Sequence, residues 1–230
     1  MNDTINHICR LCSSDKTEQL NYAYGERQYC FCSQCHLIFA DQASLPDYES
    51  ERQRYEMHQN HLHDTGYIRF LQQLLVPLAN ILSSAREGLD YGCGPEPVLA
   101  HLIRSQGYKC EIYDPIFFPE LQPKDYDFIT ATECIEHFHF PSVDFDKISK
   151  MLRQEGILAL MTDTWQSIEK FGTWHYIRDF THVCFYNILT MSWLAEKYGM
   201  SLIYTDSRRV FIFRNLSLFN IFQRGVIFVL

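Results

Sequence analysis

The sequence lacks an excess of positive charge and any long apolar run. The first absence argues against a protein that coats nucleic acid, and the second against a membrane-spanning helix. Its 230 residues include 20 lysines and arginines against 28 aspartates and glutamates, for a net charge of −8. Proteins that coat nucleic acid usually present a basic face, so this balance argues against that class. No stretch reaches the roughly 18 apolar residues that a membrane-spanning helix needs. The length suits one full domain with a small additional module.

An export signal is also missing from the sequence. Residues 1–10 are polar and contain no apolar core of the secretory kind. The most apolar segment, 216–230, is too short to span a membrane and contains Asn220, Gln223 and Arg224. We treat it as an apolar tail of unassigned role. These features predict a cytoplasmic protein with reduced cysteines, in which clustered cysteines favour metal binding over disulfides.

Four of the nine cysteines form two C-x2-C pairs: Cys9, Cys12, Cys32 and Cys35. The segment between the pairs alternates tyrosine with polar residues around Gly25, which predicts a β-hairpin. The hairpin would bring the pairs together, and four thiolates complete the tetrahedral shell of a structural zinc ion. We therefore predict a zinc ribbon over residues 1–45, in which Zn²⁺ replaces a large apolar core. Cys30 has no suitable spacing and is assigned to packing.

Residues 46–85 are predicted to form a helical linker or lid. Asp64 is a suitable N-cap for a helix over Gly66–Leu82, where apolar residues recur at helical spacing. Pro77 is expected to kink or divide this helix. Three nearby histidines, His58, His61 and His63, suggest either a second metal site or, as the favoured alternative, a solvated polar segment.

A glycine turn marks the start of the main domain, which we place at residues 86–215. Leu89–Tyr91 is predicted to be a short strand, and Gly92 and Gly94 after it allow a ligand to approach the backbone closely. The dinucleotide pattern needs a third glycine, but proline stands there and a glutamate precedes it. This disfavours a diphosphate and favours an uncharged or cationic nucleoside.

Alternating strands and helices follow the glycine turn. Predicted strands are 109–113, 126–132, 157–161, 202–205 and 210–213, and predicted helices are 98–106, 144–152 and 187–198. Asp114 ends the first of these strands, about 20 residues after the glycines, where a carboxylate can accept hydrogen bonds from ribose hydroxyls. The pattern predicts an α/β fold with an open sheet that binds its ligand at the carboxyl ends of the strands.

Three motifs in this order resemble class I S-adenosylmethionine-dependent methyltransferases. They are the sequence Leu-Asp-Tyr-Gly-Cys-Gly-Pro at 89–95, Asp114, and Glu133-x-x-Glu-His137. With the cysteine module, the chain also resembles zinc-containing sugar C-methyltransferases and, in residues 174–176 and 179–183, bacterial zinc-ribbon methyltransferases. The resemblance implies a Rossmann-like sheet. Its third strand is expected to be reduced, because few residues separate Asp114 from the strand at 126–132.

The resemblance also implies S-adenosylmethionine as the cofactor. Carried over residue by residue, it implies contacts from Tyr91, Gly92, Cys93, Gly94, Asp114, Pro115, Thr132 and Glu133. The glycine turn would face the methionine part, Asp114 would hold the ribose, and Thr132 and Glu133 would lie near the sulfonium. In place of the contacts that a full third strand supplies to adenine, we expect Ile116 and Phe117.

The segment 164–186 carries a dense set of polar and aromatic side chains on the expected acceptor side. Histidine is the first candidate for a base near neutral pKa. We predict His175 or His182 as the general base, with Asp179 orienting one of them and His137 as a third candidate. Two alternatives stay open. The histidines only satisfy backbone groups, or His137, His139, His175 and His182 bind a metal.

The favoured function is methyl transfer to a small-molecule acceptor, such as a sugar nucleotide or another biosynthetic intermediate. One alternative is RNA methylation, which a basic stripe around Arg10, Lys16 and Arg27 would support and the net charge opposes. Another is a binding protein that keeps the fold without activity. The sequence makes no prediction of the oligomeric state.

Overall fold

Six strands form a central sheet in the order β5-β4-β6-β7-β10-β9 in the computed structural model, which describes residues 7–25, 27–57, 61–83 and 86–216. The parallel strands are β4 (Glu87–Tyr91), β5 (Lys109–Tyr113), β6 (Tyr126–Thr132) and β7 (Leu152–Met161). An antiparallel pair, β10 (Val210–Asn215) and β9 (Met200–Thr205), closes one edge. The predicted Rossmann-like open sheet is confirmed.

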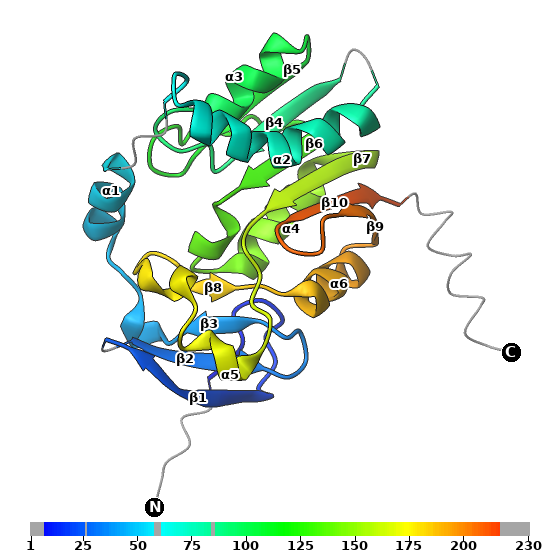
Figure 1. Cartoon of the computed structure of the whole chain (residues 1–230). Helices are drawn as coiled ribbons and strands as arrows, with labels where there is room; N and C mark the ends of the chain where they lie inside the picture. Colours follow the sequence, from blue (N-terminus) through cyan, green and yellow to red (C-terminus); the bar gives the residue numbers. More distant parts are fainter. Residues whose placement is uncertain (1–6, 26, 58–60, 84–85, 217–230) are drawn as a thin grey trace, which may run out of the picture.

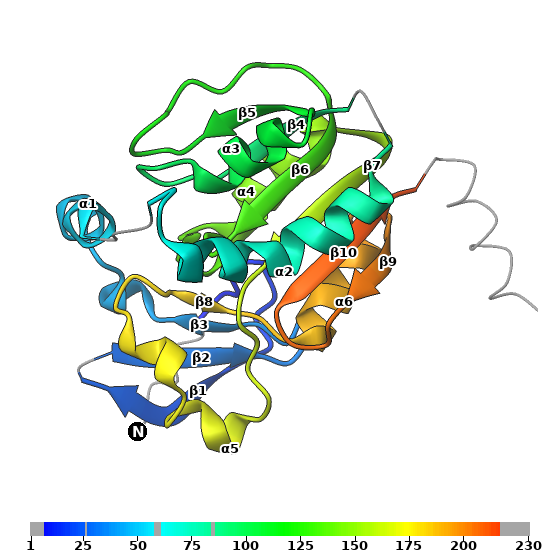
Figure 2. The ribbon, with the colours of Figure 1, turned by 45° about the horizontal axis from the view of Figure 1, so that its top comes forward.

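Helices cover both faces of this sheet (Figures 1 and 2). The helices are α2 (Thr65–Ile81) and α3 (Val98–Ser105) on one face, and α4 (Pro141–Met151) and α6 (Ile188–Lys197) on the other. Side chains of β7 alternate between the faces: Ile157 and Ala159 pack with α2 and α3, and Leu158 and Leu160 with α4 and α6. This period of two places one apolar core on each side of the sheet.

The third strand of the fold is reduced, as the sequence predicts. Between Asp114 and Tyr126 the structure has only an isolated bridge, which pairs Asp114 with Phe118. The chain therefore turns back directly beside the carboxyl end of β5, and this turn stays next to the glycine turn after β4.

Helix α2 runs through Pro77 without interruption, so Pro77 does not divide the helix, and the alternative expectation of a kink stays a prediction. The predicted N-cap is confirmed, because the Asp64 carboxylate accepts from the backbone N–H of Gly66 at 2.8 Å and of Tyr67 at 3.0 Å. Buried Leu74 and Leu78 press the helix onto the sheet on both sides of Pro77. This packing offsets the hydrogen bond that proline cannot make.

A second sheet joins the N-terminal module to the main domain. It contains β1 (Thr17–Tyr24), β2 (Arg27–Cys32), β3 (Ile38–Ala40) and β8 (Cys184–Phe185), in that order. The first three strands belong to the N-terminal module, whereas β8 comes from the main domain and pairs antiparallel with β3. Figure 1 shows β8 lying along β3, with the short helix α5 (Ile168–Phe171) beside the same sheet. The module therefore shares a core with the main domain.

The linker contributes one further helix, α1 (Tyr48–Glu56), and three short 3₁₀ turns complete the fold: η1 (Gln42–Ser44), η2 (Ile135–His137) and η3 (His175–Arg178). Within the described ranges, no helix is both long and apolar enough to span a bilayer. The predicted apolar tail, apart from Leu216, and His58 lie outside the described residues.

Candidate functional site

A cavity of about 580 Å³ opens at the carboxyl ends of β4, β5 and β6. The turn after β4 forms its floor, and both glycines of this turn have positive φ, +77° at Gly92 and +68° at Gly94. A Cβ at Gly92 would lie 2.6 Å from the Cβ of Cys134, so only glycine fits there. Helix α1 supplies Glu51 and Tyr55 to the opposite wall.

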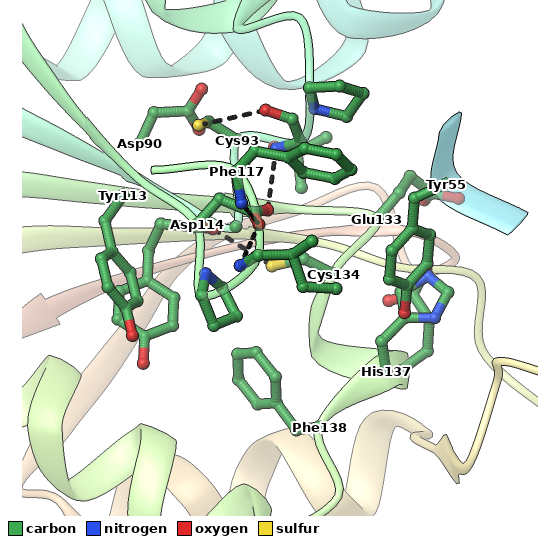
Figure 3. Close-up of a pocket in the computed structure, with 18 of the residues that line it drawn as sticks. Tyr55, Asp90, Cys93, Tyr113, Asp114, Phe117, Glu133, Cys134, His137 and Phe138 are labelled. Carbon is green, nitrogen blue, oxygen red and sulfur yellow. Dashed lines mark hydrogen bonds between the residues drawn. The ribbon is translucent and has the colours of Figure 1, made fainter. Parts of the chain in front are cut away.

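The carboxylate of Asp114 ties two turns of the cavity together. One oxygen, Oδ2, accepts from the backbone N–H of Gly94 at 3.0 Å. The other, Oδ1, accepts from Ile116 at 2.9 Å and Phe117 at 3.1 Å (Figure 3). Oδ2 keeps room for one more donor, because a carboxylate oxygen accepts two hydrogen bonds. Asp114 is thus both a support for the glycine turn and an acceptor that a ribose hydroxyl can reach.

Thr132 is the last residue of strand β6, Glu133 follows it, and both line the cavity. Glu133 has φ +48°, in the left-handed region that side chains rarely adopt. The Thr132 hydroxyl oxygen and Glu133 Oε1 are buried without a hydrogen-bond partner. Burial, followed by the nearby charge of Glu136, raises the pKa of Glu133 well above its usual range. These polar atoms are available to a ligand with hydrogen-bond donors or positive charge.

All eight residues predicted to contact the cofactor line this one cavity: Tyr91, Gly92, Cys93, Gly94, Asp114, Pro115, Thr132 and Glu133. Ile116 and Phe117 line it as well. Aromatic rings from several elements complete the walls: Tyr67, Phe70, Tyr113 and Phe138. Figure 3 shows Tyr113 and Asp114 on one side of the group of residues drawn, and Tyr55, Glu133 and His137 on the other.

His137 and His182 line the side of the cavity opposite Asp114, and their ring centroids lie 4.8 Å apart. His137 Nδ1 lies 2.9 Å from the carbonyl oxygen of Thr181, and His182 Nδ1 lies 2.7 Å from that of Tyr176. A carbonyl only accepts, so each Nδ1 carries the proton and each neutral ring keeps an electron pair on Nε2. Burial, then the neighbouring His137, lowers the pKa of His182 to about 3.

Glu136 also lines this end of the cavity, and Tyr176, which does not line it, contacts Glu136 from behind. The hydroxyl of Tyr176 donates to Glu136 Oε1 in a short hydrogen bond and lies 3.3 Å from Glu133 Oε2. The other Glu136 oxygen accepts from the Thr162 hydroxyl at 2.9 Å. The motif Glu133-x-x-Glu-His137 contains Glu136, but neither Glu136 nor Tyr176 has a role that the sequence predicts. A glutamate beside a predicted site histidine was the available signal.

His175 is not brought to this cavity. Its side chain is 62% exposed, and its Nε2 lies 3.9 Å from a carboxylate oxygen of Asp163. It lines a second, more open cavity, which shares Asp179 and His182 with the first. The structure therefore separates His175 from the residues predicted to contact the cofactor.

Among the described residues, the Asp179 carboxylate forms no hydrogen bond to the imidazoles that it was predicted to orient. Its carboxylate accepts from Arg54 Nη2 at 2.6 Å and from the Thr181 hydroxyl at 2.7 Å. Burial alone would raise its pKa, but the hydrogen bonds from Arg54 and Thr181 hold the pKa of Asp179 below its usual range. Asp179 thus fastens helix α1 to the segment that carries His182.

The other predicted metal ligands give two different outcomes. The four Sγ atoms of Cys9, Cys12, Cys32 and Cys35 lie within 4.8 Å of one another, and Cys30 is buried outside this cluster. The alternative set of four histidines does not assemble, since His139 pairs with Glu51 at 2.8 Å and His175 lies apart. In the described ranges, His61 and His63 belong to no group of ligands, and His61 contacts Glu96.

Comparison with known proteins gives the family. A family model described as a methyltransferase domain matches residues 59–205. No curated protein matches the chain. Similar solved structures include an O-methyltransferase family protein from Burkholderia thailandensis, with 12% identity over 73% of this chain and 63% of that chain and a TM-score of 0.50. They also include the cyclopropane synthase of Mycobacterium tuberculosis, with 16% identity over 70% and 77% of the two chains and a TM-score of 0.48. The chain therefore belongs to the methyltransferase-domain family, as the sequence predicts.

Proposed function

We propose that the chain transfers a methyl group from S-adenosylmethionine to a small-molecule acceptor, and that both molecules bind in the cavity at the strand ends. One observation carries the proposal: a single cavity of about 580 Å³ contains the glycine turn, Asp114, His137 and His182. This volume falls in the range of roughly 300–1,000 Å³ that small-molecule sites occupy.

The residues on the Asp114 side fit the cofactor. Gly92 and Gly94 leave backbone exposed to the methionine part, and Oδ2 of Asp114 can accept from a ribose hydroxyl. The unpartnered oxygens of Thr132 and Glu133 suit its ammonium or sulfonium charge, and aromatic faces such as that of Tyr113 suit a cation or a base. S-adenosylmethionine supplies a methyl carbon that its positive sulfur activates for displacement.

The acceptor's reactive atom would lie beside His137 and His182. The simplest route for its proton is to the free electron pair on an imidazole Nε2. His182 is a weak base, because its pKa is lowered to about 3. We therefore assign the general base to His137 and a polar contact with the acceptor to His182. His175 has no such place, because it lies outside the cavity.

The cysteine cluster is proposed to hold a structural Zn²⁺. Three of its four thiols are buried, and none of them lines the cavity. Four thiolates leave the ion no open position for chemistry, so its role is to hold the ribbon together. The cytoplasm, which keeps thiols reduced, suits such a site.

The alternative of RNA methylation gains little support from the residues suggested for it. Arg27 turns inward, and its Nη1 donates to the carbonyl oxygen of Asp179 at 3.0 Å. Arg10 stacks over the ring of Phe39 and is half-buried. Because two of the three basic side chains are engaged within the fold, no basic stripe is left for a phosphate backbone. The acceptor is therefore proposed to be a small molecule.

Calorimetric titration of the zinc-loaded chain with S-adenosylhomocysteine, followed by transfer of a labelled methyl group to a panel of small hydroxylated acceptors, tests the proposal. Micromolar binding and labelling of one acceptor class are expected. Absence of binding in a folded, zinc-loaded sample would contradict the proposed function. Binding without transfer to any member of a broad panel would favour the inactive alternative.

A further inference from the structure

Three side chains of different kinds converge at the acceptor end of the cavity. Glu136, His137 and His182 each place one oxygen or nitrogen ligand atom within 4.8 Å of those of the other two. All three residues line the cavity, and Glu136 is fully buried. They come from two segments, the 3₁₀ turn after β6 and the loop before β8. Glu136 and His137 are neighbours in the sequence, and the fold brings His182 to them from a distant segment.

The hydrogen bonds of both imidazoles suit metal ligation. Each Nδ1 is held by a backbone carbonyl, that of Thr181 for His137 and that of Tyr176 for His182. A metal-binding histidine usually donates its other ring N–H to a carbonyl or carboxylate, which fixes the tautomer and aims the free nitrogen at the ion. Here both rings have such a support, so both Nε2 electron pairs are available.

Two carboxyl groups also meet at this point, and the charge of Arg209 acts on Glu133 without forming an ion pair with it. Glu133 and Glu136 approach the same Tyr176 hydroxyl. None of the ion pairs in the described part of the chain includes Glu133 or Glu136. Hydroxyl groups alone contact the Glu136 carboxylate. Buried carboxylates are normally paired with a cation or coordinate a metal, because desolvation of an unpaired charge is costly.

We propose that Glu136, His137 and His182 bind a divalent transition-metal cation at the acceptor end of the cavity. Two imidazoles and one carboxylate form a ligand set that suits such ions and leaves coordination positions open. This site is separate from the closed cysteine site, whose soft thiolates favour zinc.

The cation deepens the proposed function, on which this inference rests, by naming the class of acceptor. An acceptor with a hydroxyl group would ligate the ion through its oxygen, and the ion would lower the pKa of that hydroxyl. The hydroxyl proton leaves to water, the oxygen forms a bond to the methyl carbon, and the carbon–sulfur bond breaks to give the neutral thioether. With the ion bound, His137 is a ligand, and this role replaces the general-base role that the proposed function gives it in the absence of the ion.

Titration of the zinc-loaded chain with Mn²⁺ tests the site. Binding is measured as the loss of the free-ion signal in electron paramagnetic resonance. Mn²⁺ prefers oxygen and imidazole to thiolates, so it leaves the cysteine site undisturbed. The variants are His137→Asn and His182→Asn, whose amide N–H can replace the Nδ1 donor while Nε2 is lost. His175→Asn is the matched control, since His175 is 62% exposed and outside the cluster. Bound zinc and S-adenosylhomocysteine affinity are measured on each sample to check the fold.

One Mn²⁺ per chain is expected in the unmodified protein and in His175→Asn, with affinity at least about tenfold weaker in the other two variants. The proposal is overturned if the chain binds no Mn²⁺, or if both cluster variants bind it as well as the control. Retained S-adenosylhomocysteine binding in that case leaves the proposed function intact. If the unmodified chain binds Mn²⁺ but not S-adenosylhomocysteine, the proposed function is contradicted and the metal site is not.

Discussion

Arg27 of the N-terminal module donates a hydrogen bond of 3.0 Å to the backbone carbonyl of Asp179 in the main domain. The same guanidinium donates to the carbonyl of Ile177 at 3.3 Å and to that of His182. Arg27 begins strand β2, which ends at Cys32, one of the four predicted zinc ligands. A half-buried cation thus connects the predicted zinc hairpin to the loop that places His182 in the cavity.

Replacement of Arg27 by glutamine should slow methyl transfer on the order of tenfold to a hundredfold, because the loop that carries His182 would lose its position. S-adenosylhomocysteine affinity should change little, since Gly94 and Asp114 are held by other contacts. Steady-state kinetics and calorimetry on the same preparation measure both quantities. Arg52→Gln is the matched control, because Arg52 forms only an exposed pair with Glu56. Equal losses in both variants would argue against a positioning role.

Cys32→Ser should abolish stoichiometric zinc binding and lower the melting temperature of the whole chain in one transition. The reason is that β3 of the module pairs with β8, so loss of the hairpin exposes part of the main core. Cys30→Ala is the control, because Cys30 is buried outside the ligand cluster. It should keep one zinc per chain and cost roughly 1 kcal/mol as a small cavity. Zinc loss in Cys30→Ala would show that the predicted ligand set is wrong.

How far the sequence could predict this architecture depends on whether a feature is local. The cysteine pairs and the glycine turn follow from short spacings, and the cysteines assemble as predicted. The shared sheet could not be predicted, because it depends on the pairing of Phe39 with Cys184 across a long stretch of chain. This long-range pairing gives the ribbon and the main domain a common core, which no local spacing specifies.

The histidines show a second reason. His175 lies in the 3₁₀ turn η3, where residues three positions apart share a face. Tyr176 and Ile177 are buried, so His175 and Arg178 face solvent. The sequence gives no period for so short a turn, and it therefore could not separate His175 from His182. The hydrogen bonds that Asp114 accepts from the backbone N–H groups of Gly94, Ile116 and Phe117 could not be predicted either. The sequence pattern predicts a contact of Asp114 with a ligand and carries no information on its partners within the fold.

Asp114→Asn should weaken S-adenosylhomocysteine binding roughly tenfold to a hundredfold. The amide can accept through only one atom, so either the N–H of Gly94 or those of Ile116 and Phe117 would face another donor. A buried donor without a partner costs about 1–3 kcal/mol, which corresponds to that range of affinity. Calorimetry on the variant measures the change. The exposed Asp125→Asn should bind like the unmodified chain, and equal affinity for Asp114→Asn would contradict the role given to this carboxylate.

The stability of the protein should fall on acidification below about pH 6.5, and His182 should account for part of the loss. Its pKa is lowered to about 3 in the folded chain, mainly by burial, whereas an unfolded histidine titrates near 6.5. Between these values the unfolded chain binds a proton that the folded chain excludes, so folding loses up to about 1.4 kcal/mol per pH unit. The raised pKa of Glu133 acts in the opposite direction, and a variant is needed to isolate His182.

The measurement is urea unfolding at about pH 7 and about pH 5.5, without added divalent cation, on the unmodified chain and on His182→Asn. The unmodified chain should lose about 1 kcal/mol more than the variant over this interval, because asparagine has no proton to exclude. Zinc loss and carboxylate titration affect both proteins and cancel in the comparison. Parallel losses in the two proteins would mean that His182 titrates normally, and would remove the argument for preferring His137 as the base.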